Sequence, residues 1–378
     1  MNTFLIILCG FIFGLLIAFS KLNRYNTISG LSVLKNFTVA KTIMLIIGVG
    51  SILLAFQMNA GLSVFHVKPL YLIATPVGGL IFGMGMAILG YCPGTLPISL
   101  GEGSVDALIG ILGGLTGGLL FSVLYPVLRP LFGEFLGTAT LFTAMGSTFS
   151  IGYILMVILL GMLMIAGAFY LNYLDIKLNR INGHRWIITG VGVAVLNIFL
   201  FLKTVANMPL EVSHSYLYPF LKWGMNKPLG ASSSYPYAAD VMTGFTQNSY
   251  FPTVLNSGSW QIKFLLGAFL AGLAYSLYKK SFKIRLIHTR WAFYKGYNRW
   301  KRVIWAFIGG FLLIMGARIA DGCTSGHIIS GGMQFAASSY LFMVFTFIGF
   351  LLTGHYFYVK PKNGSPSKNE NIPDMEEP

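Results

Sequence analysis

Nine apolar stretches alternate with polar segments along the chain. They lie at 3–20, 38–59, 70–91, 104–127, 152–172, 185–203, 260–278, 302–321 and 333–357. A helix needs about twenty apolar residues to cross the hydrocarbon core of a bilayer. The pattern therefore predicts an all-α polytopic membrane protein with about nine transmembrane helices.

The spacing of these stretches divides the chain into four parts. We expect a first repeat at 1–127, a connector with the fifth span at 128–184, a second repeat at 185–357, and a polar, disordered tail at 358–378. The longest polar insertion, 204–259, should be an extracytoplasmic loop rich in Tyr, Ser, Pro and Asn. It would serve either as an aromatic cap over an entrance or as an interfacial loop, and we slightly favour the latter.

Composition supports the membrane assignment and narrows the function. Hydrophobic residues make up 55% of the 378, charged residues only 10%, and the mean hydropathy is +0.71. A soluble domain has about 25% charged residues. With three cysteines, no disulfide framework is expected. The chain has no Walker loop and no dinucleotide fingerprint, so we expect no cofactor, no ATP-driven step within the chain and no enzyme activity.

The net charge of +15 is unevenly distributed. Eighteen Lys and Arg residues fall in the loops at 21–37, 172–185 and 279–302 and in the tail, against five in the alternate loops. This bias predicts the N-terminus outside and the C-terminus in the cytoplasm. Nine of the eighteen lie in 279–302, where they should attract anionic lipid headgroups and also an anion passing through, rather than nucleic acid.

Two cysteine-bearing segments match each other. Aligned on Cys92 and Cys323, they share glycine pairs at positions −14 and −13, a glycine at −7, a serine at +7 and a glycine at +9. By the predicted topology the helix before Cys92 runs inward and the helix before Cys323 runs outward. The two copies are therefore predicted to form an inverted repeat, a design that transporters use.

Each cysteine is surrounded by residues that interrupt helices. Pro93 disfavours helix at Cys92, and small residues allow tight turns; these are Gly90, Gly94, Gly322 and Gly326. Irregular backbone at membrane depth persists only where protein or water covers it. We therefore expect broken helices whose re-entrant cysteine loops face each other across a buried, thiol-lined path.

Several residues near the loops are candidates for substrate binding. Cys92 and Cys323 would hold a soft, sulfur-bearing ligand, because a thiol is a weak donor and acceptor; a structural alternative is simple packing. Packing is the interpretation that we favour for Cys9, a possible third relay thiol. Four hydroxyl groups could donate hydrogen bonds to anionic oxygens, or merely cap helices. They belong to Thr95, Ser99, Thr324 and Ser325.

Charged residues flank the second cysteine. Arg318 and Asp321 are three residues apart on one helix and close enough to pair. Such a pair would either set the field beside Cys323 or be structural. His327 would either tune the thiol of Cys323 or cap the loop. Met84 and Met86 near Cys92 leave Cu(I) as an alternative ligand, but they lie on different helix faces, so we expect no bound metal.

These residues resemble the YeeE/YedE sulfur-transport family of bacterial inner-membrane proteins. The resemblance rests on Gly-Tyr-Cys-Pro-Gly-Thr at 90–95, Gly-Ala-Arg at 316–318, Gly-Cys-Thr-Ser-Gly-His at 322–327 and Ser-Gly at 330–331. It implies thiosulfate import along an hourglass-shaped path in which thiols pass the ligand on by transient hydrogen bonds. Beyond the sulfur anion and membrane lipid, a cytoplasmic sulfur-carrier protein is a candidate partner. Asp321 departs from the family, in which glycine is more usual at that position.

Two other functions fit the same cysteines. A membrane sulfurtransferase would form a persulfide on an activated thiolate, and only Arg318 and His327 are placed to activate one. A permease for selenium species or Cu(I) would use the same small-residue loops. Import of thiosulfate or a related sulfur anion is the function that we predict.

Overall fold

The computed structural model describes residues 3–178, 180, 183–203, 225 and 227–358. These residues form helices and no strands, apart from isolated bridges, which confirms the all-α prediction. The helices of the first half are α1 (Thr3–Phe19), α2 (Tyr25–Ser32), α3 (Thr38–Asn59), α4 (Ala74–Leu89), α5 (Leu96–Gly101), α6 (Val105–Leu128), η1 (Arg129–Phe132), α7 (Leu141–Ala144), α8 (Ile151–Lys177) and α9 (Arg185–Phe201). Those of the second half are α11 (Ser234–Thr243), α12 (Phe251–Tyr278), α13 (Thr289–Lys295), α14 (Arg299–Ile319), η4 (Thr324–Gly331) and α15 (Ala337–Phe357).

Helix length separates the apolar helices into two groups. Among the described residues, six helices are long and apolar enough to cross a membrane: α3, α6, α8, α12, α14 and α15. Helices α1, α4 and α9 are apolar but have only 16 or 17 residues. At 1.5 Å per residue they are about 25 Å long, somewhat short of a hydrocarbon core of about 30 Å. The count of nine spans therefore stays a prediction.

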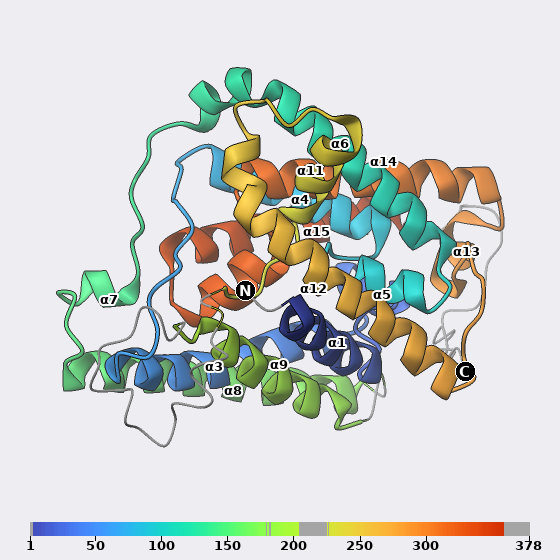
Figure 1. Ribbon diagram of the computed structural model, residues 1–378. Helices are drawn as coiled ribbons and strands as arrows, with labels where there is room; N and C mark the ends of the chain where they lie inside the picture. Colours follow the sequence, from blue (N-terminus) through green and yellow to red (C-terminus); the bar gives the residue numbers. More distant parts are fainter. Residues whose placement is uncertain (1–2, 179, 181–182, 204–224, 226, 359–378) are drawn as a thin grey trace.

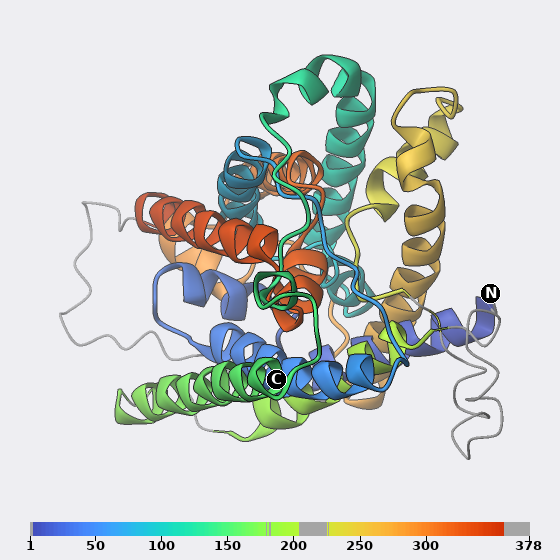
Figure 2. The same ribbon diagram turned by 90° about the vertical axis from the view of Figure 1, so that its left-hand side faces the viewer.

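The helices are arranged in two bundles with α1 and α12 between them (Figure 1). In the lower part of Figure 1, α3 packs on α8 and α9; in the upper part, α4 packs on α14 and α15, and α14 also packs on α6. Figure 2 shows from another side that α8, the long green helix, lies at the bottom edge of the molecule. Few side chains of α8 are buried, and its role as a connector between repeats stays a prediction.

Glycines bring α4 and α14 into close contact. A Cβ on Gly78 would lie 2.7 Å from the Gly316 carbonyl oxygen, and a Cβ on Gly85 would lie 2.8 Å from that of Gly309. The N-terminal half of α4 thus contacts the C-terminal half of α14, and vice versa. The two helices that precede the cysteines are therefore antiparallel.

The matched serines and glycines of the two cysteine segments make matching contacts. Gly79 lies against α15 and Gly310 against α6. Beyond the cysteines, Ser99 donates to the Asn23 carbonyl at 2.6 Å, and Ser330 donates to the Leu229 carbonyl at 3.0 Å. Each serine thereby ties the helical turn after its cysteine to the chain just ahead of a short helix, α2 or α11.

The segment that we expected to be a loop is helical over much of its described length. Helix α11 begins at Ser234, and α12 begins at Phe251, nine residues before the predicted span at 260. Residues 204–224 and 226 lie outside the described residues, as does the predicted tail from 359. Tyr358, which we had assigned to the tail, is buried, and its hydroxyl lies 2.7 Å from that of Tyr25.

Candidate functional site

Each cysteine follows a helix that ends in a left-handed residue. Gly90 ends α4 with φ +79°, and Asp321, just after α14, has φ +55°. Both stand two residues before their cysteine. Glycine adopts this conformation freely, whereas other residues are strained in it. This explains physically why glycine is the expected residue where Asp321 stands.

Cys92 is partly buried at the start of a short turn. Its backbone N–H donates to the Thr95 hydroxyl at 3.0 Å, and that hydroxyl donates back to the Cys92 carbonyl at 3.1 Å. The thiol is within hydrogen-bond reach of the Thr95 side chain and of the backbone N–H groups of Gly94 and Thr95. Thr95 therefore closes the loop in the manner of a cap while remaining next to the thiol.

Cys323 is almost fully buried, with 1% exposure. Its Sγ lies 3.3 Å from the Ser325 hydroxyl, and Ser232, Ala231 and the backbone of Gly326 are also within hydrogen-bond reach. The hydroxyl of the neighbouring Thr324 is buried without a hydrogen-bond partner in the described residues. Both thiols thus lie among small polar groups.

A polar segment from outside the two motifs packs against both cysteine loops. Residues 229–236, ahead of and at the start of α11, are all buried. The Tyr235 hydroxyl donates to the Pro93 carbonyl at 2.9 Å, next to Cys92, while Ser232 lies beside Cys323. For these residues the expectation of an interfacial loop was wrong.

Buried amides hold this segment in place. The side chain of Gln261 in α12 accepts from the Ser233 N–H at 2.8 Å. Asn197 in α9 accepts from the Leu229 N–H at 2.9 Å and donates to Ser330 at 3.2 Å. The sequence pattern did not identify these residues; the only signal for them was the presence of single polar residues within apolar stretches.

Arg318 is a buried cation beside the second cysteine. Its guanidinium donates to Ser232 at 2.7 Å, to Ser233 at 3.2 Å and to the Tyr250 hydroxyl at 3.1 Å. It lies 3.8 Å from Asp321, as the spacing predicted. Asp321 in turn pairs with Lys68 at 3.3 Å. Arg318 therefore joins the serine segment to the helix that leads to Cys323.

His327 makes structural contacts. One ring nitrogen lies 2.8 Å from the Ala320 carbonyl oxygen and the other 3.1 Å from the Ser339 hydroxyl. Both nitrogens therefore stabilise the turn around Cys323, and its tuning of the thiol stays a prediction. Cys9 is buried in α1, a helix that packs on α12 and α9, and the packing role that we favour for it stays a prediction.

A buried ionic cluster lies next to Tyr91, the residue before Cys92. Arg302 donates to Asp106 at 3.1 Å, and His288 lies 3.1 Å from the same carboxylate and 3.0 Å from the Tyr91 hydroxyl. Arg302 belongs to the basic loop that we expected at the membrane surface, yet it has no exposed area. The expectation was wrong for this residue, because Asp106 at the start of α6 neutralises it inside the protein.

Similarity to known proteins extends over most of the chain. A family model described as "Sulphur transport" matches residues 19–352. A thiosulfate transporter of Spirochaeta thermophila, TsuA, is 27% identical over 101 residues, which cover 27% of this chain and 31% of that protein. The alignment thus covers less than a third of the relative's length.

Proposed function

Because this chain belongs to the sulphur transport family, we propose that it carries thiosulfate or a closely related sulfur-containing anion across the bacterial cytoplasmic membrane. One observation carries the proposal: a single buried segment that contains serines and a tyrosine contacts both cysteine loops, although these loops come from distant parts of the sequence. Packing alone does not require two thiols and so many small polar groups at one place in an apolar protein.

The surroundings of the thiols suit a sulfur oxyanion. Thr95 and Gly94 beside Cys92, and Ser325, Ser232 and Gly326 beside Cys323, offer hydroxyl or N–H donors to anionic oxygens. The Thr324 hydroxyl has no partner among the described residues and is available to a ligand. A thiol adds a weak donor that suits sulfur. The anion would exchange part of its hydration for these groups and move between the thiols by hydrogen bonds.

The two halves of the chain are proposed to form an inverted repeat with nine spans. Three observations support this: the antiparallel contact of α4 and α14, the matching contacts of Gly79 and Gly310, and the left-handed residues two positions before each cysteine. Helix α8, which buries few of its side chains, would be the connector between repeats. In such transporters the binding site lies at the repeat interface near the midplane.

The order of the two cysteines along the path follows from the charge bias. Loops with most of the Lys and Arg residues are assigned to the cytoplasm, which leaves Cys323 in the outer half and Cys92 in the inner half. The anion would meet Cys323 first. Arg318, whose buried guanidinium donates to Ser232 beside this thiol, would stabilise the anion there.

Growth on thiosulfate tests the proposal. A bacterium without its own sulfate and thiosulfate importers receives the intact gene, the Cys92→Ala or Cys323→Ala form, or Cys9→Ala as a matched control, with thiosulfate as sole sulfur source. We expect growth with the intact and Cys9→Ala chains and none with the other two, at equal membrane expression.

The other outcomes are equally informative. Normal uptake in both single variants would refute the thiol relay. No growth with the intact chain would move the substrate to another sulfur or selenium species. A persulfide adduct on Cys323, detected by mass spectrometry during turnover, would point instead to covalent sulfur transfer.

A further inference from the structure

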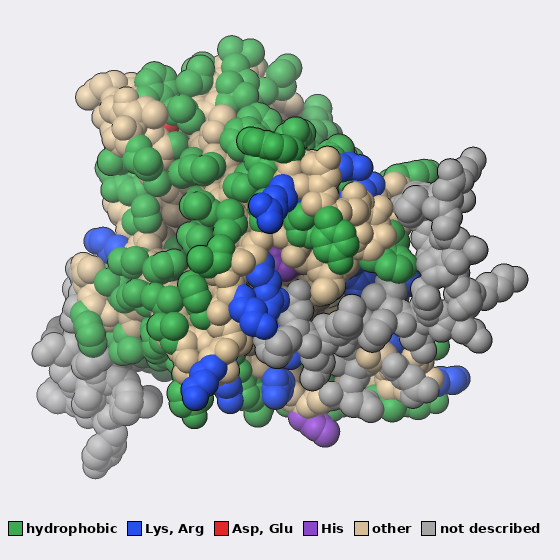
Figure 3. All heavy atoms as spheres, turned by 90° about the vertical axis from the view of Figure 1, so that its right-hand side faces the viewer, with side chains coloured by type: hydrophobic (Ala, Val, Ile, Leu, Met, Phe, Trp, Pro, Cys, Tyr) green, Lys and Arg blue, Asp and Glu red, His purple; other side chains and the backbone are tan. Residues whose placement is uncertain are grey.

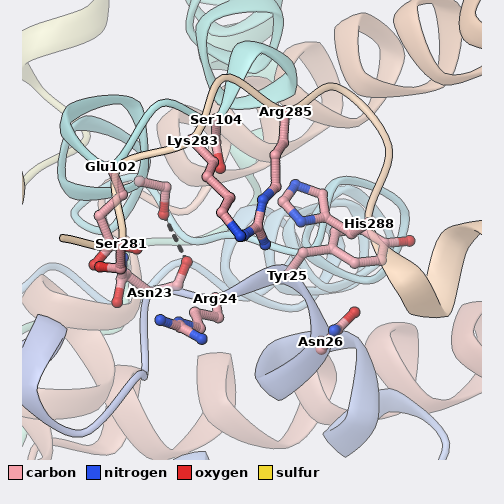
Figure 4. Close-up of a pocket in the computed structure, with 11 residues that line it drawn as sticks. Asn23, Arg24, Tyr25, Asn26, Glu102, Ser104, Ser281, Lys283, Arg285 and His288 are labelled. Atoms are coloured by element: carbon pink, nitrogen blue, oxygen red, sulfur yellow. Dashed lines mark hydrogen bonds between the residues drawn. The ribbon is translucent and has the colours of Figure 1, made fainter. Parts of the chain in front are cut away.

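A pocket opens next to the turn that follows Cys92. It encloses about 440 Å³, part of it open to solvent, and is formed by three separate segments of the chain (Figure 4). These segments are 23–26 at the start of α2, 99–104 at the end of α5, and 281–288 between α12 and α13. All three belong to loops that we assign to the cytoplasmic side.

The rim of the pocket is fixed by backbone hydrogen bonds. The Arg285 N–H donates to the Gly103 carbonyl at 2.9 Å, and the Val105 N–H donates to the Arg285 carbonyl at 2.7 Å. On the opposite side, Ser99 donates to the Asn23 carbonyl. Segments far apart in sequence are thus held together before any ligand arrives.

The lining is predominantly cationic. Arg24, Lys283 and Arg285 line the pocket with His288, against the single carboxylate of Glu102. In Figure 4 the ends of Lys283 and Arg285 lie beside the His288 ring and face the segment that carries Asn23 and Arg24. On the molecular surface, Lys and Arg side chains gather around a hollow in which a histidine is visible (Figure 3).

One polar group in the lining has no partner among the described residues. Asn23 has no exposed area, and neither its side-chain nitrogen nor its side-chain oxygen makes a hydrogen bond. Burying an amide without a hydrogen-bond partner costs about 1–3 kcal/mol of folding free energy, as judged from mutations in proteins. Asn23 therefore brings to the pocket lining an amide that no described residue satisfies.

The pocket also lies near the site of Cys92. Helix α5, whose residues 96–101 span about 9 Å, has the Cys92 loop at one end and Ser99 of the pocket near the other. His288 in the pocket wall lies 3.0 Å from the hydroxyl of Tyr91, the residue before Cys92. On the topology that we assign, the pocket therefore lies on the cytoplasmic side of Cys92 and close to it.

We propose that this pocket is an oxyanion-binding site, in which Lys283, Arg285 and Asn23 hold the transported dianion on its way to the cytoplasm. The assignment rests on the proposed function, because only transport brings a sulfur oxyanion here. The same chemistry would also bind the phosphate of an anionic lipid, so the experiment has to distinguish a free anion from a headgroup.

Protection of an introduced thiol measures occupancy of the pocket directly. Ser281 lines the pocket and is partly exposed. In full-length Ser281→Cys protein in phosphatidylcholine nanodiscs, the rate at which the introduced thiol reacts with N-ethylmaleimide is followed by peptide mass spectrometry with and without sulfate, an unreactive dianion. Chloride keeps the ionic strength constant. Sulfate at about ten times its Kd should slow the reaction about tenfold, since the unoccupied fraction falls as 1/(1 + [L]/Kd).

Matched variants identify the residues. Lys283→Gln with Arg285→Gln should abolish the protection, whereas Lys279→Gln with Lys301→Gln, the same change in charge on residues that do not line the pocket, should preserve it. If Ser281→Cys does not fold, thermal unfolding of the native chain with and without sulfate replaces the labelling measurement. Sulfate should raise the unfolding midpoint of the native chain but not that of the Lys283→Gln/Arg285→Gln form. Equal protection in both double variants would overturn the site.

Two further measurements distinguish a free anion from a lipid headgroup, and the pocket from the thiol relay. Protection by phosphatidylglycerol nanodiscs with no effect of sulfate would overturn the assignment in favour of a lipid headgroup. Sulfate protection that persists in Cys92→Ala protein would support the pocket even if the growth test fails, so the two proposals fail independently.

Discussion

At the scale of single residues, the position two before each cysteine decides how its helix ends. Gly90 and Asp321 both have a positive φ, and only Asp321 has side-chain partners there, Lys68 and Arg318. A non-glycine residue in this region is disfavoured by roughly 1–2 kcal/mol. The ion pairs of Asp321 offset part of that strain.

Substitution of Asp321 tests this balance. Asp321→Gly removes the strain and the ion pairs together, so the thermal midpoint in detergent should change little. Asp321→Ala retains the strain without the pairs and should destabilise the protein by about 1 kcal/mol. Gly90→Ala should be worse, because its Cβ would lie 2.2 Å from the Tyr25 ring. A lower midpoint for Asp321→Gly than for Asp321→Ala would contradict the argument.

The buried cluster around Asp106 gives a second prediction at this scale. Asp106→Asn leaves the fully buried Arg302 without its counter-ion, and breaking such a pair typically costs about 3–5 kcal/mol. We expect loss of folded protein in size-exclusion chromatography after mild heating. Lys68→Gln, which breaks the partly exposed pair with Asp321, should cost less than about 1 kcal/mol. Similar losses in both variants would show that burial of the pair is unimportant.

At the scale of elements, glycine spacing determines how closely α4 and α14 approach. Helices in lipid gain little from apolar burial and associate through close packing of small residues. A Cβ on Gly316 would lie 2.4 Å from the Phe82 backbone nitrogen. The glycines at positions −14 and −7 of both motifs therefore set the distance between the two helices that lead to the cysteines.

Gly316→Ala should thus separate these helices and destabilise the protein by about 1–3 kcal/mol, the usual range for overpacking. Thermal unfolding in detergent measures the change. Gly152→Ala in α8 is the matched control, because the nearest atom to its Cβ is 3.8 Å away; its midpoint should be unchanged or slightly higher. Equal midpoints for the two variants would be evidence against close packing.

At the scale of the whole molecule, the unequal distribution of Lys and Arg predicts orientation. A green fluorescent protein fused after residue 378 should fluoresce in the cytoplasm, and alkaline phosphatase fused after residue 203 should be active outside. The opposite pair of signals would reverse the order of Cys323 and Cys92 in the path. It would also place the basic pocket at the entrance of that path.

The sequence by itself determined the helical class, the positions of the long apolar helices apart from the first nine residues of α12, and the two cysteine motifs, because these depend on local hydropathy and on residue type. It did not determine that 229–236 is buried, since that segment is polar and has no apolar period. Gln261, Asn197 and Arg318 from three different helices satisfy its polar groups. The burial of Arg302 likewise depends on Asp106, 196 residues away along the chain. Such long-range pairing of polar groups leaves no periodic trace in a sequence, and only the tertiary structure decides it.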